Sequence, residues 1–528
     1  FKVLFLYPNG TLMNPPAIAI GIFTALLKQN GVEVDLFDTT LYPDVDPDAK
    51  QLDDEKEESL QARPTSYDDS GVKLLTSDMA TDLALKVEAF KPDLIAVSLL
   101  ESIYPIALTM FDVIENYDIP VLVGGVFAMH APEVVIENKC IDMVCIGEGE
   151  ETIVEVSKRL ASNKDCYDVD NLWIKKDDKI IKNKLKNTIN VNEIPIPDYS
   201  LFEWERFMRP MGGKIYNTIP VESNRGCPYL CTFCNSPSTF DLFKQNESSS
   251  FFRKKTIKTI HKELISLKNQ WNAEYVYFTS DTFLVLTKEE LDELADLYVR
   301  DINLPFWIQT RAETLTPFRV KKLKEMGCHR ISIGLEHGNE EFRRKILKKT
   351  FSDKTIIYGT NLLADVGIPL TVNNIIGFPE ENRDLVFDTI ELNRKLIVDT
   401  TNCVAFAPFR GTPLHKLCVT KGYIKPDQLG YGSMTTSVFL DLPTFPKEEI
   451  QGIRRTFSMY VRMPKTYWPD IERAEILDEE GMQNGTGGVF GEIPDNYQIY
   501  ARCIYTRSAY SPDAAPIRQL TAREKQIW

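Results

Sequence analysis

The stretch Cys227-Pro-Tyr-Leu-Cys231-Thr-Phe-Cys234 places three thiols on one short loop with C-x3-C-x2-C spacing, directly after an extended run from Asn217 to Arg225. Three cysteine thiolates can hold three corners of a four-iron four-sulfur cluster and leave the fourth iron without a protein ligand. A structural zinc site needs four protein ligands, and the next His or Cys is His261, in a stretch with helical spacing. The loop therefore favours a cluster with one open iron over a zinc knuckle or three unrelated thiols.

Length and composition limit what this loop can be attached to. At 528 residues and 43% hydrophobic, the chain is long enough for about two to four domains. A formal net charge of −15 disfavours nucleic acid as a partner, because binding a phosphate backbone needs a basic face. The sequence has no apolar run of membrane-spanning length, and Phe1 to Tyr7 predicts a strand rather than a signal segment. Since seven of the ten cysteines are scattered, a reducing compartment and a cytoplasmic location are expected.

Residues 1–155 alternate strand and helix patterns. Apolar runs such as Lys2 to Tyr7 and Asp93 to Ser98 are separated by segments with helical spacing, such as Ala17 to Asn30. This alternation predicts an α/β domain with a doubly wound parallel sheet covered on both faces. Ligands of such sheets bind at the carboxyl ends of the strands, where paired glycines let a flat ligand approach the backbone. Those ends carry Asn9, Ser98, Leu99, Glu101, Gly124, Gly125, Val126, Gly147 and Glu148.

Three segments carry no chemistry that the sequence can identify. Residues 156–216 are predicted to be a connector with a small hairpin and a proline-stiffened crossover. The acidic run Asp44 to Glu58 is typical of a solvated surface insertion. Residues 421–528 break the alternation, are rich in aromatics and include a glycine run from Gly481 to Gly491. This mainly helical segment either fills its own core or closes the open side of the preceding domain and shapes a substrate pocket, with the glycine run as a mobile lip.

Residues 217–420 return to the alternation, with six strands separated by helices. Six such units predict a partial (β/α)6 barrel, in which reactive groups gather at the carboxyl ends of the strands. Arg311 and Glu336 follow the third and fourth strands, and each alone would be typical of a salt bridge. Together with the cysteine loop they indicate a cofactor site. The strand candidates are Ile219 to Ser223, Tyr275 to Thr279, Phe306 to Thr310, Arg330 to Leu335, Leu370 to Ile376 and Val404 to Ala407.

The cysteine loop, with Phe233 before its last thiol, resembles the signature of the radical S-adenosylmethionine (radical SAM) enzymes. Ser280-Asp281-Thr282-Phe283 resembles the family's Asp-Asp-x-Phe element near the methionine amino group. Gly334-Leu-Glu-His-Gly338 is close to Gly-Leu-Glu-Ser-Gly, with His337 where the family has a serine, which puts a hydroxyl contact there in doubt. The resemblance implies that Arg311 contacts the methionine carboxylate, Glu336 the ribose or amine, and Pro408 the adenine.

The N-terminal segment resembles the cobalamin-binding domain that precedes the radical SAM core in one large subclass. That subclass has Gly-Gly after the fourth strand and Gly-Glu-Gly-Glu after the fifth, as in Gly124-Gly125 and Gly147 to Glu150 here. None of the five histidines follows an aspartate by two residues, so the Asp-x-His motif that ligates cobalt from below is missing. The alternative is a nucleotide-binding or vestigial flavodoxin-like domain, although no Gly-x-Gly-x-x-Gly follows the first strand.

Together the two resemblances imply a cobalamin-dependent radical SAM methyltransferase acting on an unactivated carbon or phosphorus centre. Its cofactors would be a four-iron four-sulfur cluster, S-adenosylmethionine and cobalamin. Its partners would be a small-molecule or peptide substrate and an electron donor such as flavodoxin or ferredoxin. The alternative within the superfamily is a cobalamin enzyme that rearranges, cyclises or oxidises its substrate. A methylthiotransferase is disfavoured because the N-terminal domain lacks suitably spaced cysteines, and a non-enzymatic corrinoid or redox sensor would not need the polar strand ends.

Overall fold

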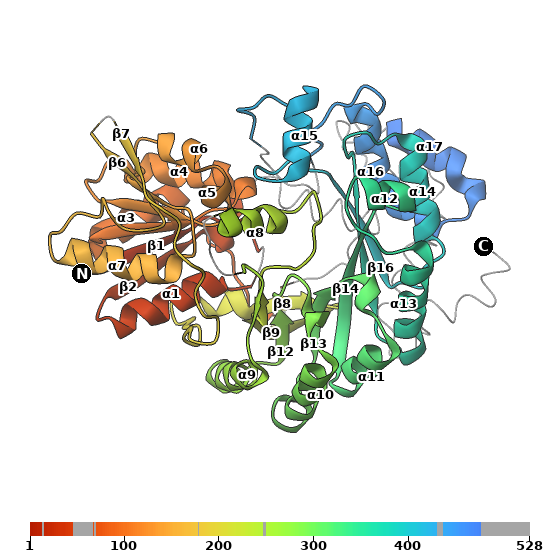
Figure 1. Ribbon diagram of the computed structural model, residues 1–528, viewed down its shortest axis with the longest axis horizontal. Helices are drawn as coiled ribbons and strands as arrows, with labels where there is room; N and C mark the ends of the chain where they lie inside the picture. Colours follow the sequence, from red (N-terminus) through yellow and green to blue (C-terminus); the bar gives the residue numbers. More distant parts are fainter. Residues whose placement is uncertain are drawn as a thin grey trace.

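The computed structural model describes residues 1–12, 15–45, 67, 70–177, 179–245, 250–429 and 437–476. Within these ranges the chain forms two α/β domains that lie side by side, the N-terminal one in red and orange and the barrel in green and blue (Figure 1). The glycine run at 481–491 and nearly all of the acidic run at 44–58 lie outside the described residues. None of the described helices is long and apolar enough to cross a membrane.

The N-terminal sheet has the strand order β2-β1-β3-β4-β5-β6-β7, and β1 to β5 are parallel, which confirms the predicted doubly wound sheet. The hairpin β6–β7 was predicted to lie in the connector, but it extends this sheet because β6 pairs antiparallel with β5. Leu172 and Ile174 of β6 are buried in the core, which explains why the hairpin docks on that edge. The strands are β1 (Lys2–Tyr7), β2 (Glu33–Asp38), β3 (Leu94–Ser98), β4 (Val121–Gly124), β5 (Met143–Cys145), β6 (Leu172–Lys176) and β7 (Lys179–Lys182).

Helices cover both faces of this sheet because its strands are apolar on both sides. Along β1, Val3 and Phe5 pack with the helices of one face, whereas Leu4 and Leu6 pack with those of the other. The first face carries α1 (Ile18–Gln29) and α7 (Gly149–Ala161). The second carries α3 (Met79–Phe90), α4 (Tyr104–Ile114), α5 (Val126–His130) and α6 (Pro132–Glu137).

The barrel sheet has the order β16-β15-β14-β13-β12-β9-β8 and does not close, so the predicted partial barrel is confirmed. Its six parallel strands overlap the six predicted ones, although the first and the last begin five and four residues earlier than expected. A seventh strand, β8, forms an antiparallel hairpin with β9 and lies in the segment predicted as connector. The strands are β8 (Met208–Met211), β9 (Lys214–Val221), β12 (Tyr275–Phe278), β13 (Phe306–Thr310), β14 (Cys328–Glu336), β15 (Leu370–Ile376) and β16 (Thr400–Ala405).

Helices line the outside of the barrel sheet (Figure 1). The sequence did not single out α8 (Ser236–Gln245), which begins two residues after the cysteine loop. The short helix α12 (Glu340–Lys345) follows β14. The remaining helices of this domain are α9 (Ile257–Trp271), α10 (Lys288–Leu297), α11 (Pro317–Glu325), α13 (Asp353–Val366), α14 (Arg383–Asn393) and α15 (Pro413–Lys421).

The described C-terminal segment packs against the last strand of the barrel. It contains α16 (Lys447–Arg462) and α17 (Trp468–Ile476), and α16 contacts β16 and α14. Phe457 and Tyr460 are fully buried in one core cluster with Phe378 and Phe406 of the barrel. These aromatics therefore fill a shared core on the outer side of the sheet.

The connector also joins the cores of the two domains. Tyr199 is fully buried and lies against Gly21 of α1, and its hydroxyl donates to the carbonyl of Pro220 in β9 at 3.2 Å. A Cβ on Gly21 would lie 2.7 Å from the Tyr199 ring, so this close approach requires glycine. One hydrophobic cluster runs through both domains at this point, which fixes the two sheets relative to each other.

Candidate active site

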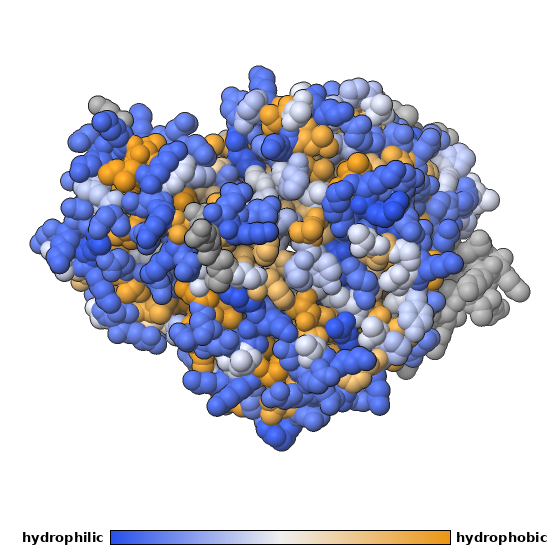
Figure 2. All heavy atoms as spheres, viewed as in Figure 1, coloured by the Kyte–Doolittle hydropathy of each residue, from blue (hydrophilic) through white to orange (hydrophobic). Residues whose placement is uncertain are grey.

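Three adjoining cavities lie where the carboxyl ends of the two sheets face each other. The cysteine cavity, of about 200 Å³, contains the three thiols, and the glycine cavity, of about 330 Å³, lies at the edge of the N-terminal sheet. A middle cavity of about 450 Å³ shares Val126 and Phe251 with the glycine cavity and Cys234 and Asp281 with the cysteine cavity. Figure 2 shows hydrophobic residues in the depression between the two domains. The fold therefore brings the two predicted sites onto one continuous space.

The cysteine loop begins immediately after β9 and the short strand β10 (Asn224–Arg225), and all three thiols line the cysteine cavity. The backbone N–H of Cys227 donates to the Ser236 hydroxyl at 3.2 Å, and the Cys227 Sγ lies 3.6 Å from the Thr282 hydroxyl. The Ser236 N–H points at Cys234 Sγ at 3.5 Å. Hydrogen bonds with the first turn of α8 thus shape the loop.

Burial raises the pKa of the Cys227 thiol and raises that of Cys234 to about 12. Thiols with a raised pKa lose their protons when they bind iron, so binding of the metal group itself converts these cysteines to thiolates. Among the described residues, no three His, Cys, Asp or Glu side chains lie close enough to hold a single metal ion. The thiolates that hold a four-iron four-sulfur cluster surround it and do not meet at one point. The three thiols of this loop likewise line a cavity.

Arg311, predicted after the third strand, lies in the same cavity. Its Nη1 donates to Cys231 Sγ at 3.0 Å, its Nε pairs with Glu313 at 2.7 Å, and its guanidinium stacks 4.0 Å from the Tyr229 ring. The side chain is almost completely buried. These contacts hold a forked cation beside the thiols, where an incoming carboxylate could bind it in bidentate fashion.

Glu336 is held at the end of β14 in an unusual backbone conformation. Its φ of 68° lies in the left-handed region, and the register with β15 shifts between Gly334 and Glu336. Lys349, which the sequence analysis missed, donates to Glu336 Oε1 at 3.1 Å and to the Gly334 carbonyl at 2.7 Å. A strained non-glycine residue that neighbours hold in place is typical of a functional site. No spacing rule could have identified Lys349, because it follows a helix rather than a strand.

Asp281 lines both the cysteine and the middle cavities, and its carboxyl faces that open space. Burial, together with the charge of nearby Glu222, raises the pKa of Asp281 to about 6. Ser280 points the other way, and its buried hydroxyl lies 2.6 Å from that of Ser223. Only one member of the predicted pair therefore faces the cavity, while the other fixes the start of the cysteine loop.

His337 and Pro408 do not line any of the three cavities. His337 is fully buried, stacks 4.1 Å from the Phe342 ring and lies 3.1 Å from a Glu381 carboxylate oxygen. Pro408 is buried between Ala407 and Phe409, which both line the middle cavity. Phe233 lines the cysteine and middle cavities, as its place before the last thiol suggested.

The glycine cavity is formed by the strand ends that the sequence predicted. Ser98, Gly124, Gly125, Val126, Gly147 and Glu148 line it. A Cβ on Gly124 would have no neighbour nearer than 3.8 Å, so this glycine leaves open space at the sheet edge. Gly125 has a φ of 105°, and its Cβ would lie 2.5 Å from the Leu99 carbonyl oxygen. The barrel contributes Glu222, Arg225, Phe251 and Thr279, which the sequence analysis did not connect with this site.

Three predicted residues of the N-terminal edge lie beside the glycine cavity instead of lining it. Asn9 is buried and donates from its side chain to Thr40 Oγ1 at 2.8 Å, which fixes the loop after β1. Leu99 is buried behind Gly125. The Glu101 carboxylate accepts the backbone N–H of Arg410 at 2.9 Å and so connects the two domains. Their contacts are those of supporting residues.

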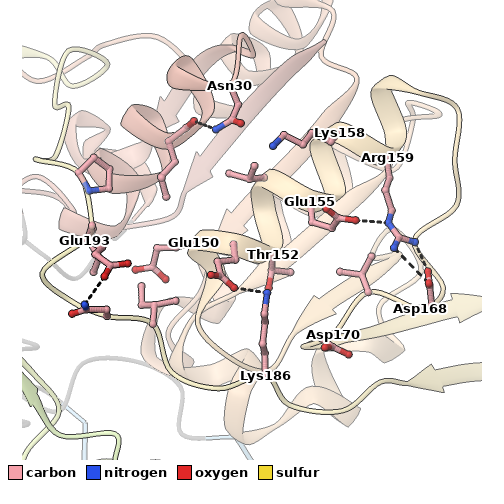
Figure 3. Close-up of a pocket in the computed structure, with 18 residues that line it drawn as sticks. Asn30, Glu150, Thr152, Glu155, Lys158, Arg159, Asp168, Asp170, Lys186 and Glu193 are labelled. Carbon is pink, nitrogen blue, oxygen red and sulfur yellow. Dashed lines mark hydrogen bonds and ion pairs between the residues drawn. The ribbon is translucent and has the colours of Figure 1, made fainter. Parts of the chain in front are cut away.

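A separate open pocket of about 610 Å³ lies between α1, α7 and residues 186–195 of the connector (Figure 3). Most of its charges pair with one another, since Arg159 binds Glu155 and Asp168, and Lys186 binds Glu151. The first turn of α7 separates this pocket from the glycine cavity, with which it shares Glu150 and Thr152. We assign no chemistry to it.

Comparisons with known proteins agree with this geometry. The radical SAM superfamily model matches residues 221–392, and the B12 binding domain model matches residues 66–157. The chain is 26% identical to an uncharacterized methyltransferase of Pyrococcus horikoshii over 74% of this chain and 83% of that protein. It is 20% identical to cytidylyl-2-hydroxyethylphosphonate methyltransferase of Streptomyces wedmorensis over 89% and 91% of the two chains.

A solved structure shares the fold of both domains. OxsB, a cobalamin-dependent S-adenosylmethionine radical enzyme solved with aqua-cobalamin and S-adenosylmethionine, is 16% identical. Its TM-score is 0.64, and the match covers 100% of this chain and 75% of that chain.

The fold and the site define a radical SAM enzyme with an N-terminal B12-binding domain. More narrowly, the chain is similar to methyltransferases and to a cobalamin-dependent radical SAM enzyme.

Proposed function

We propose that this protein is a cobalamin-dependent radical SAM methyltransferase that methylates an unactivated carbon. The observation that carries the proposal is the middle cavity, which shares lining residues with the cysteine cavity on one side and the glycine cavity on the other. When bound, the cluster supplies the electron that cleaves S-adenosylmethionine, and cobalamin supplies the methyl group. An acceptor in the middle cavity could be reached from both sides.

We propose distinct tasks for the side chains of the cysteine cavity. Cys227, Cys231 and Cys234 hold the cluster, and Arg311 binds the methionine carboxylate through its forked guanidinium. Glu336, fixed by Lys349, accepts hydrogen bonds from the ribose or the amine, while Phe233 and the backbone around Pro408 contact the adenine. The protein thus orients S-adenosylmethionine with side chains that its own contacts already hold.

The lining of the middle cavity favours carbon over phosphorus as the methyl acceptor. Val126, Phe251, Ile375, Phe406 and Phe409 provide apolar walls. Among the described lining residues the ionisable groups are Asp281 and Cys234, and no basic side chain is present. A phosphorus acceptor with anionic oxygens would need a cation in this cavity, because burying an unpaired charge is costly. We therefore propose a small-molecule or peptide substrate that presents an apolar group, with electrons supplied by an external flavodoxin or ferredoxin.

The test is turnover of reconstituted holoenzyme with S-adenosylmethionine labelled in its methyl group, scored against a panel of apolar acceptors. Methyl transfer uses S-adenosylmethionine in two roles, so S-adenosylhomocysteine and 5′-deoxyadenosine should form in comparable amounts, with label in the product. Turnover of a substrate without S-adenosylhomocysteine would replace methyl transfer by rearrangement, cyclisation or oxidation. Labelled product from a phosphorus acceptor alone would overturn the choice of carbon.

A further inference from the structure

We propose that Arg225 is a positioning residue that, with Arg253, ties the Gly147–Glu150 loop of the N-terminal domain to the cysteine loop and so sets the separation of the two cofactors. The residues involved are Arg225 and Arg253 of the barrel and Glu148 and Glu150 of the N-terminal domain, here called the arginine–glutamate cluster. The inference rests on the proposed function only in assuming that both cofactors work on one substrate. Its geometry stands on the contacts of these four side chains.

Arg225 bridges the two domains through both glutamates of the loop. Its Nη1 lies 3.0 Å from Glu148 Oε1 and 2.7 Å from Glu150 Oε1, and its Nε lies 3.3 Å from Glu222. The exposed fraction of the side chain is 16% for Arg225, 6% for Glu148 and 8% for Glu150. Removal of one partner from a mostly buried ion pair is strongly destabilising, because it leaves the other charge uncompensated.

Arg253 strengthens the same connection from the neighbouring strand. In the two-stranded ribbon of β10 and β11 (Arg253–Lys254), Arg225 lies opposite Arg253. Arg253 donates to both carboxylate oxygens of Glu148, at 2.9 and 2.5 Å, and to the Ile189 carbonyl at 2.6 Å. Burial acts to raise the pKa of Glu148, but the Arg253 hydrogen bond and the Arg225 charge outweigh it and hold that pKa below its usual range. Both oxygens of the Glu148 carboxylate therefore already accept hydrogen bonds from the barrel arginines.

The cluster connects directly to both cofactor sites. Arg225 lies two residues before Cys227, and the intervening Gly226 has a φ of 79°, with its Cβ position 2.7 Å from the Phe251 ring. On the other side, Glu148 follows Gly147, and both residues line the glycine cavity. A Cβ on Gly147 would lie 2.6 Å from Asn171, so the loop is also packed against its own domain. A shift at Arg225 would therefore move one cofactor site relative to the other.

The experiment compares Arg225→Gln and Arg225→Lys with Arg159→Gln as a matched control. Arg159 also makes two ion pairs, with Glu155 and Asp168. It lies in the separate open pocket beside α7 and lines none of the three cavities (Figure 3). The first readout is the magnetic interaction between cobalt(II) and the reduced cluster, seen by electron paramagnetic resonance in loaded enzyme without turnover. The second is the amount of 5′-deoxyadenosine formed per S-adenosylhomocysteine.

We expect Arg225→Gln to change the magnetic interaction and to raise the product ratio by about tenfold, because misplacement of about 1 Å can cost 100-fold in rate. Arg225→Lys should lie between this variant and the wild type, while Arg159→Gln should match the wild type in both readouts. Should Arg225→Gln lose iron or cobalamin, Glu150→Gln, which removes one of the contacts, decides the question with the same readouts. An unchanged magnetic interaction in a fully loaded variant would overturn the proposal. If the wild type makes no methylated product, the proposed function fails, but the magnetic interaction still tests the role of the arginine–glutamate cluster.

Discussion

The two sheet edges that face each other in this molecule are built from different residues. The barrel edge carries charged side chains that protein partners hold, such as Arg311 with Glu313 and Glu336 with Lys349. The edge of the N-terminal sheet carries Gly124, Gly125 and Gly147. A small charged ligand needs side chains that can reach it, whereas a large flat ligand needs open space beside the backbone. The same parallel-sheet architecture therefore serves two very different ligands through the residues at its strand ends.

The largest expected effect comes from removing the thiols of the barrel edge. Anaerobic reconstitution of wild type should give about four irons and four sulfides per chain, and the triple variant C227A/C231A/C234A should give none. Activity should fall below detection while cobalamin binding remains, because none of the three thiols lines the glycine cavity. Iron, sulfide and cobalamin analysis measures this, and a full cluster in the triple variant would contradict the assignment.

A second change fills the glycine cavity and should have the opposite effect, with loss of cobalamin binding and retention of the iron–sulfur cluster. In Gly124→Phe the new ring points into the open side of the cavity, and overpacking of this kind costs about 1–3 kcal/mol. Cobalamin affinity should fall by about tenfold or more, while the iron content stays at the wild-type value. Equilibrium binding of cobalamin tests this. Unchanged affinity would place the corrin elsewhere.

The N-terminal edge also makes a spectroscopic prediction. Because the Asp-x-His motif is missing and no histidine lines the glycine cavity among the described residues, bound cobalt(II) should show no splitting from an imidazole nitrogen. Electron paramagnetic resonance of the cobalt(II) form measures this directly. Nitrogen splitting, or the absence of any cobalamin uptake, would contradict it.

Arg311 gives a more moderate test of the charged edge. Arg311→Ala removes a charge-assisted contact worth about 1.5–3 kcal/mol, so S-adenosylmethionine should bind roughly tenfold to hundredfold more weakly. The conservative Arg311→Lys should recover only part of this, because an ammonium cannot form the forked contact. Binding is measured on cluster-loaded enzyme, with iron content as the control. Full affinity in Arg311→Ala would remove this residue from the ligand site.

The smallest expected effect concerns the contact between the two edges. Burial lowers the pKa of His130 to about 4, and its Nε2 lies 3.0 Å from the Thr239 hydroxyl of α8. Above pH 6.5 the ring is neutral in both folded and unfolded chains, so it adds no pH dependence there. Between pH 6.5 and 4 the histidine binds a proton in the unfolded chain but not in the folded chain. The free energy of unfolding therefore decreases as the pH is lowered, by about 2 kcal/mol at pH 5. When the pH is lowered, the Tm of His130→Gln should fall by a few degrees less than that of the wild type. Equal losses of Tm in the two proteins would contradict the low pKa assigned to His130.

The predicted parts of the fold depended on local patterns. The six barrel strands and the parallel N-terminal sheet were predicted correctly because buried parallel strands are continuous apolar runs separated by helices. The hairpin β6–β7 and the strand β8 were assigned to a connector, since nothing in their own residues says which sheet edge they join. Strand pairing between distant segments depends on which edges remain free in three dimensions.

By itself the sequence determined which residues lie at the two facing sheet edges of this protein, because the residues after a parallel strand are brought together by the strand order alone. The C-x3-C-x2-C loop, Arg311, Glu336 and the paired glycines needed no coordinates to be identified. Only the tertiary structure decided that Lys349 holds Glu336, that Glu148 binds Arg225 and Arg253 at the edge of the glycine cavity, and that His337 points into the core. These outcomes depend on contacts between segments up to 105 residues apart, and side-chain direction over such separations is set by packing and charge pairing rather than by local spacing.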